Sequence, residues 1–130
     1  MGYFYVGIGG AAGSLLRYLL SFLQTPDSLL PYGTLIVNLS GSFFLGYLTS
    51  RYKDKIKIPE YLYTAFTTGL IGSYTTFSTF CLEVIKLIES GHAVLSFLYL
   101  LISVAGGIVL AWYGLFVGRT GWKRREGVQG

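Results

Sequence analysis

Four long apolar blocks constrain this chain more than any other feature of its sequence. They cover residues 3–23, 33–50, 61–88 and 94–117, and short polar segments connect them. A helix needs about 20 apolar residues to cross a bilayer. Only 12% of the residues are charged, whereas a soluble domain has about 25%. The pattern predicts an all-α membrane protein of one domain with four transmembrane helices, followed by a basic polar tail (118–130) that we expect to be frayed.

The third block differs from the other three in length and in polarity. Its 28 residues exceed what one straight span requires, so the helix tilts, projects from the membrane or is interrupted. The block also contains five serine and threonine residues within positions 73–79. So many hydroxyl groups in an apolar segment indicate either hydrogen bonding between helices or a polar path through the bundle.

Small residues recur at four-residue spacing in two of the blocks. Gly9 and Gly13 form a GxxxG pattern, and Ser103, Gly107 and Ala111 form a similar stripe in the last block. In membranes such residues allow helix backbones to approach closely. We interpret both patterns as packing within the chain, with a contact between subunits as the alternative.

Three of the polar side chains inside the apolar blocks are especially costly to bury, namely those of Arg17, Asn38 and Glu83. Arg17 either faces a polar cavity or extends toward the nearby membrane surface. Asn38 either bonds a neighbouring helix or directs an N–H donor into a pathway, because an amide has two donors and one acceptor to satisfy. Glu83 is the one acidic residue well inside a block. The helical spacing places it on one face with Thr76 and Phe80.

These groups favour an anion over a cation as the transported species. Hydroxyl and amide groups donate to anions, and the edge of a phenylalanine ring carries partial positive charge. Phe77 and Phe80 lie among the hydroxyl-bearing residues, three positions apart. Weak contacts at several sites suit a pore, because the ion must be able to leave. From the residues alone, simple packing of the two rings is the better supported alternative.

Three segments of the sequence are similar to the signatures of a known family. GIGGAAGSLLRY, YGTLIVNLSGSFFLG and GLIGSYTTFSTFCLE resemble, in order and spacing, three signatures of the Fluc (CrcB) family of fluoride channels. The resemblance covers nearly the whole chain, and TTFSTF is its most specific part. It implies a passive fluoride channel of the plasma membrane, built as an antiparallel, dual-topology dimer whose third helix is broken near its middle.

The resemblance also implies roles for individual residues. It implies a fluoride pathway formed by Arg17, Asn38, Phe77, Ser78, Thr79, Phe80, Glu83, Tyr99 and Ser103. It further implies that backbone carbonyls of Gly72 and Thr75 hold a structural Na⁺ at the dimer centre. Gly107 departs from the pattern, since some members carry a serine there. The resemblance therefore does not assign the residues at the far end of the path.

Other functions fit the sequence less well. A small four-helix multidrug transporter needs an acid in its first helix, but the first block has Arg17 and no acid. An inert assembly subunit would not need the intramembrane hydroxyls. The sequence shows no nucleophile paired with a base, which is the pattern that would indicate an enzyme. The basic residues flank the apolar blocks instead of forming a patch for nucleic acid.

The distribution of positive charge predicts an orientation. Eight lysines and arginines fall on the side that holds both termini, whereas Lys86 alone falls on the other side. This bias places both termini in the cytoplasm. We therefore expect the chain to pair with an oppositely oriented homologue, and pairing with itself is the alternative.

Overall fold

The computed structural model describes residues 2–54 and 57–126, and its regular structure over these ranges is entirely helical. The all-α fold class is thus confirmed. The long helices are α1 (Gly2–Ser21), α2 (Tyr32–Asp54) and α6 (Ala93–Glu126). Between α2 and α6 the chain forms α3 (Glu60–Thr64), the π-helix η1 (Ala65–Ile71), α4 (Gly72–Tyr74) and α5 (Ser78–Glu89).

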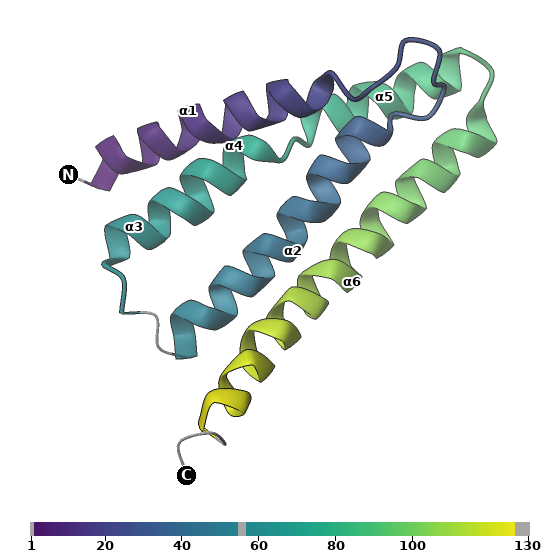
Figure 1. Ribbon diagram of the computed structural model, residues 1–130. Helices are drawn as coiled ribbons and strands as arrows, with labels where there is room; N and C mark the ends of the chain where they lie inside the picture. The colour runs from purple at the N-terminus through teal and green to yellow at the C-terminus, as the bar shows by residue number, and fades with distance from the viewer. Residues whose placement is uncertain (1, 55–56, 127–130) are drawn as a thin grey trace.

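The helices form two closely packed pairs. In one, α1 lies along η1 and α4, and in the other α2 lies along α6 (Figure 1). The α5 helix packs beside the first part of α6 and is therefore attached to the second pair. The start of α1, the end of α2 and the end of α6 lie at one end of the molecule, and the α1–α2 and α5–α6 connections lie at the other (Figure 1).

Glycines bring α1 and the third segment into backbone contact. A Cβ atom added at Gly9 would overlap the carbonyl oxygen of Ala65, and one at Gly13 would overlap that of Leu70. No side chain larger than hydrogen fits at these positions without moving the backbone. The GxxxG pattern therefore packs within the chain, as predicted from the sequence.

The α2–α6 pair is built in the same way. A Cβ atom at Gly46 would overlap the carbonyl oxygen of Ala111, and one at Gly107 would lie 3.6 Å from Ser42 Oγ. The small-residue stripe of the last block thus faces α2, which confirms its interpretation as internal packing.

The third apolar block is not one continuous α-helix. Its helical path is interrupted at Thr75, whose backbone is extended (φ −76°, ψ 157°), and helix resumes at Ser78. Before this point the seven residues of η1 wind as π-helix. π-Helical turns are rare and occur often near functional sites. The interruption and the π-helix together place an irregular backbone in the middle of the apolar block.

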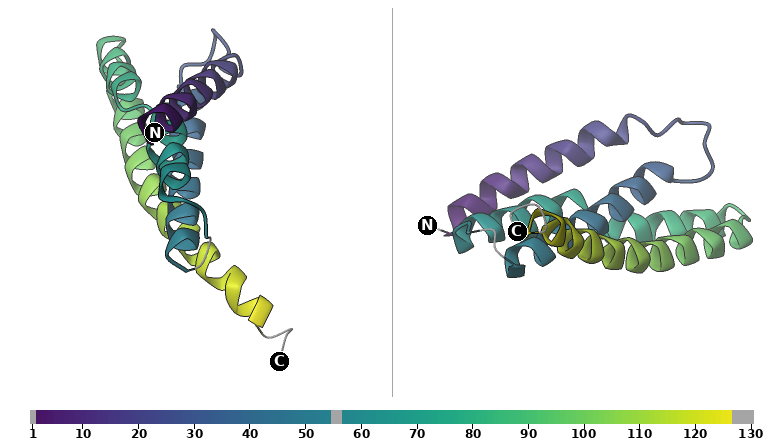
Figure 2. Two further views of the ribbon diagram at one scale, coloured as in Figure 1. Left: turned by 90° about the vertical axis from the view of Figure 1, so that its left-hand side faces the viewer. Right: turned by 60° about the horizontal axis from the view of Figure 1, so that its bottom comes forward.

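One helix of the described residues is long and apolar enough to cross a membrane by length and composition, namely Ala93–Thr120 within α6. Only 11% of its most apolar window is buried within the chain. The helix continues to Glu126, so this part of the tail is not frayed as expected. Arginine, lysine and glutamate are good helix formers, and basic side chains favour a helix C-terminus. Figure 2 shows this end of α6 extending beyond the other helices.

Candidate functional site

Asn38 holds the backbone at the interruption. Its Nδ2 donates to the carbonyl oxygen of Thr76 at 2.9 Å, and its Oδ1 accepts from the Thr76 N–H at 2.8 Å. In an uninterrupted helix that N–H would donate to the carbonyl oxygen of Gly72. The α2 side chain therefore replaces two backbone groups that helix formation would have supplied. Asn38 thus forms the hydrogen bond to a neighbouring helix, which was one of the two alternatives for this side chain. Its amide lies at the centre of the site.

Thr75 is held in place by hydrogen bonds to its own segment and by close contact with α2. Its N–H and its Oγ1 both donate to the carbonyl oxygen of Ile71, each at 3.0 Å. Its own carbonyl oxygen faces Arg17 Nη1 at 3.5 Å, which is long for a hydrogen bond. On α2, Gly41 lies so close to the Thr75 methyl group that an added Cβ would overlap it. The Thr75 side chain is thus confined between its own helix and α2.

Glu83 connects three helices through its carboxylate. One oxygen accepts from Thr34 Oγ1 of α2, and the other accepts from the hydroxyl of Tyr99 of α6, both at 2.8 Å. The Tyr99 side chain is only 1% exposed, so its hydroxyl group has little access to other acceptors. Both oxygens of this half-buried carboxylate therefore have a donor. Thr34 is missing from the sequence-predicted set, although its position four residues before Asn38 places both on one face of α2.

The two phenylalanines occupy different environments. Phe80 is 8% exposed, whereas Phe77 is 77% exposed. Their ring centroids are 6.2 Å apart with the planes inclined by 36°, and Phe80 also contacts Tyr99 with a centroid separation of 5.2 Å. Phe80 is therefore part of the core, while Phe77 projects from the chain. The chain by itself does not enclose an ion between the two rings.

The remaining sequence-predicted residues divide into two groups. Ser78 and Thr79 are exposed at the start of α5. The Thr76 hydroxyl accepts from the Thr79 N–H at 3.3 Å and donates to Thr79 Oγ1 at 3.2 Å. Ser103 instead has a buried Oγ that finds no hydrogen-bond partner among residues 2–54 and 57–126. At Gly107, where a further hydroxyl is absent from α6, the Ser42 hydroxyl lies opposite on α2.

Two cavities meet at the interruption. The larger, about 420 Å³, lies between α1, α2 and α5, and the smaller, about 300 Å³, lies between α2 and the η1–α4 segment. The site residues lining the larger cavity are Arg17, Thr34, Thr76, Thr79 and Glu83. Those lining the smaller cavity are Asn38, Gly72, Thr75, Thr76 and Phe77.

Thr76 lines both cavities, and its backbone is the group that Asn38 holds. The two cavities thus share a residue whose backbone position is set by the Asn38 amide. Arg17 faces the larger cavity, so its guanidinium group adds positive charge there. Glu83 lines the same cavity with a carboxylate, so the donors that the cavity offers to an anion are the guanidinium group and the hydroxyl groups.

Comparison with known proteins agrees with the family resemblance seen in the sequence. The family model described as CrcB-like protein, Camphor Resistance (CrcB), matches residues 4–115. The chain is similar to proteins named fluoride-specific ion channel FluC. It is 45% identical over 118 residues to FluC 2 of Staphylococcus haemolyticus (strain JCSC1435), covering 91% of this chain and 97% of the relative.

Two further relatives carry the name FluC 1. The chain is 42% identical over 107 residues to that of Desulfitobacterium hafniense (strain Y51), covering 82% of this chain and 94% of the relative. It is 45% identical over 118 residues to that of Staphylococcus aureus (strain NCTC 8325 / PS 47), covering 91% and 97%. These relatives are named as ion channels and not as enzymes.

Proposed function

The chain belongs to the CrcB family, and from this premise we propose that it is a passive, fluoride-selective channel of the plasma membrane. The observation that carries the proposal is its 42–45% identity, over most of its length, to proteins named fluoride-specific ion channels. Hydrogen fluoride is a weak acid that crosses membranes and dissociates inside the cell. A passive exit for the anion lowers the internal concentration and hence the toxicity of fluoride.

The proposed path begins in the larger cavity. Arg17 draws the anion toward the hydroxyl groups of Thr76 and Thr79, which replace part of its hydration shell. The negative charge of Glu83 would oppose an anion, but both its oxygens accept hydrogen bonds from neighbouring hydroxyls. The route then continues past Ser78, Phe77, Phe80, Tyr99 and Ser103. The edges of the phenylalanine rings offer partial positive charge to the anion there.

An antiparallel dimer completes this path in the proposal. Phe77 is 77% exposed although it lies within an apolar block, and it borders the smaller cavity. A second chain packed on this side would cover the ring and close the cavity. Irregular backbone inside a membrane is tolerated only where protein, water or an ion satisfies it. The interruption after Tyr74 therefore lies at the centre of the dimer in this arrangement, near the middle of the membrane.

A structural Na⁺ at the dimer centre is also part of the proposal. The carbonyl oxygens of Gly72 and Thr75 lack their usual helical donors, because the N–H of Thr76 donates to Asn38 and that of Thr79 donates to the Thr76 hydroxyl. Released carbonyls of this kind suit Na⁺. Each chain offers two such oxygens, and two chains offer four. Arg17 lies 3.5 Å from one of them, but a carbonyl oxygen has a second lone pair for the ion.

Fluoride efflux from proteoliposomes tests the proposal directly. Vesicles loaded with fluoride should release it into a fluoride-free medium when they contain this chain, with an oppositely oriented homologue if it requires one. Vesicles loaded with chloride are the matched control and should retain their anion. Release of both anions at the same rate, or of neither with both partners present, would contradict the proposed function.

A further inference from the structure

The outward side of α6 carries an amphipathic stripe formed by Trp112, Phe116 and Arg119, and the same spacing in the sequence continues to a lysine at position 123. In a helix with 3.6 residues per turn, these four positions fall within an arc of about 60°. Gly114 and Gly118 lie on the other side of α6, where added Cβ atoms would meet Phe43 and Ser50 of α2. The stripe therefore faces away from the helix that α6 packs against.

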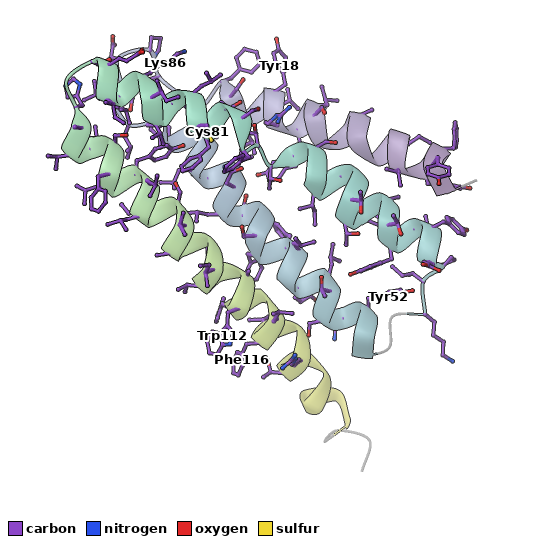
Figure 3. All side chains as sticks on the ribbon, turned by 180° about the vertical axis from the view of Figure 1, so that it is seen from behind. Tyr18, Tyr52, Cys81, Lys86, Trp112 and Phe116 are labelled. Carbon is purple, nitrogen blue, oxygen red and sulfur yellow. The ribbon has the colours of Figure 1, made fainter. Side chains whose placement is uncertain are left out.

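The first half of the stripe is aromatic and exposed. Trp112 is 66% exposed and Phe116 is 51% exposed. Their rings are stacked, with centroids 6.1 Å apart and planes inclined by 17°. Figure 3 shows both side chains projecting from α6. Stacked, outward-facing rings of this size offer a flat surface for an acyl chain.

The second half of the stripe is cationic. Arg119 is exposed, and the helix continues beyond it through the position of Lys123. Arg119 follows Gly118, which lies against Ser50 in the last turns of α2, so it is level with the polar end of the bundle. At 1.5 Å per residue, Arg119 lies about 10 Å and Lys123 about 16 Å beyond Trp112 along the axis. This spacing corresponds to the step from the acyl region of a bilayer to its headgroups.

We propose that this stripe is a binding site for an anionic phospholipid. The acyl chain lies against Trp112 and Phe116, and the phosphate group accepts hydrogen bonds from Arg119, with the lysine at sequence position 123 adding a second positive charge at this end of the helix. Arginine suits this role because its planar group binds phosphate through two parallel hydrogen bonds. The inference depends on the proposed membrane location of α6, but it is independent of the transported ion.

Tryptophan fluorescence tests the site itself. The chain has two tryptophans, so Trp122→Phe leaves Trp112 as the single reporter on the stripe. This variant is reconstituted into vesicles containing brominated phosphatidylglycerol or, in a parallel sample, brominated phosphatidylcholine. We expect Trp112 to be quenched with an apparent affinity about fivefold higher for the anionic lipid, which is the effect of about one cationic contact at a membrane surface.

Two double variants distinguish a site from the general surface charge. Arg119→Gln with Lys123→Gln should make the two brominated lipids equally effective. Lys55→Gln with Lys57→Gln removes the same charge from the same side of the membrane, between α2 and α3, and should leave the preference intact. An equal loss in both variants, or no preference in the parent protein, would overturn the proposal.

Fluoride efflux from the same vesicles separates this inference from the proposed function. Quenching without preference, together with normal efflux, rejects the lipid site and retains the channel. Absence of quenching by either lipid means that the stripe is covered by another chain, which also rejects the lipid site. A clear preference for the anionic lipid with no efflux supports the site and counts against the channel.

Discussion

Asn38 and Thr76 are joined by two hydrogen bonds that use both polar ends of the amide and both polar groups of one residue's backbone. The bonds connect α2 to the point where the third helical segment is interrupted. Thr76 also lines both cavities at this point. The side chain at position 38 thus controls the backbone geometry of the candidate site, in addition to any contact with an ion.

Asn38→Asp should lower both fluoride flux and stability. An aspartate cannot donate to the Thr76 carbonyl, and its charge would face that oxygen and any passing anion. Leaving a buried carbonyl without its donor costs about 1–3 kcal/mol. Flux from proteoliposomes and thermal unfolding in detergent measure the two effects.

Asn38→Ser is the matched variant, since a hydroxyl group retains a donor without adding charge. We expect it to be milder than Asn38→Asp in both measurements. Equal flux in the two variants would mean that the amide has only a structural role.

Gly41→Ala should disturb the site more than Gly72→Ala does. A Cβ atom at Gly41 would overlap the methyl group of Thr75, and relieving such overpacking costs about 1–3 kcal/mol. At Gly72 the nearest atom to an added Cβ is the carbonyl oxygen of Thr67 at 3.8 Å, which is ordinary contact. If the Thr75 carbonyl binds Na⁺, Gly41→Ala should also lose flux faster than the parent during prolonged removal of Na⁺. Similar behaviour of both glycine variants would contradict the importance of the Gly41–Thr75 contact.

Phe77→Ile and Phe80→Ile should both reduce flux, by about tenfold if each ring edge contributes about 1.4 kcal/mol to ion binding. Their effects on folding should differ. Phe80 is buried against Tyr99, so its replacement should also destabilise the chain by about 1–3 kcal/mol. Phe77 is exposed in the single chain, so its replacement should change folding by less than about 0.5 kcal/mol. Unchanged flux in both variants would limit the rings to packing.

Tyr99→Phe should destabilise the protein by about 1.5–3 kcal/mol, because it removes one of the two donors to the Glu83 carboxylate. Thr34→Val removes the other donor and should have a similar effect. Thr64→Val is the control, since that hydroxyl donates within its own helix, to the carbonyl oxygen of Glu60. Thermal unfolding compares the three. A control as destabilised as the other two would show that the carboxylate contacts have no special weight.

The sequence is sufficient to predict the helical class of the fold, because apolar blocks of this length with few charges leave little alternative. The π-helix from Ala65 to Ile71 has no signature in the apolar pattern, and only the structure shows that its backbone lies against Gly9 and Gly13 of α1. The role of Thr34 emerges only when α2, α5 and α6 are assembled around Glu83. The difference in exposure between Phe77 and Phe80 likewise requires the packed chain, because their spacing alone does not distinguish them.

The distribution of basic residues predicts how the chain is oriented in the membrane. By sequence position, eight basic residues fall on the side that holds both termini: Arg51, Lys53, Lys55, Lys57, Arg119, Lys123, Arg124 and Arg125. The opposite end carries Lys86 alone, near the end of α5. Proteins that insert in both orientations keep this count nearly even, whereas a strong bias holds the basic end in the cytoplasm.

We therefore expect both termini to be cytoplasmic in nearly every copy. An antiparallel dimer then requires an oppositely oriented homologue, and this chain expressed alone should conduct little fluoride. Impermeant thiol labelling of a cysteine introduced at either terminus, in a Cys81→Ser background, measures the orientation directly. Lys53→Gln combined with Arg124→Gln and Arg125→Gln should weaken the bias and increase labelling from outside. Equal labelling on both sides of the membrane in the parent chain, together with fluoride conduction by that chain alone, would favour self-pairing over the heterodimer.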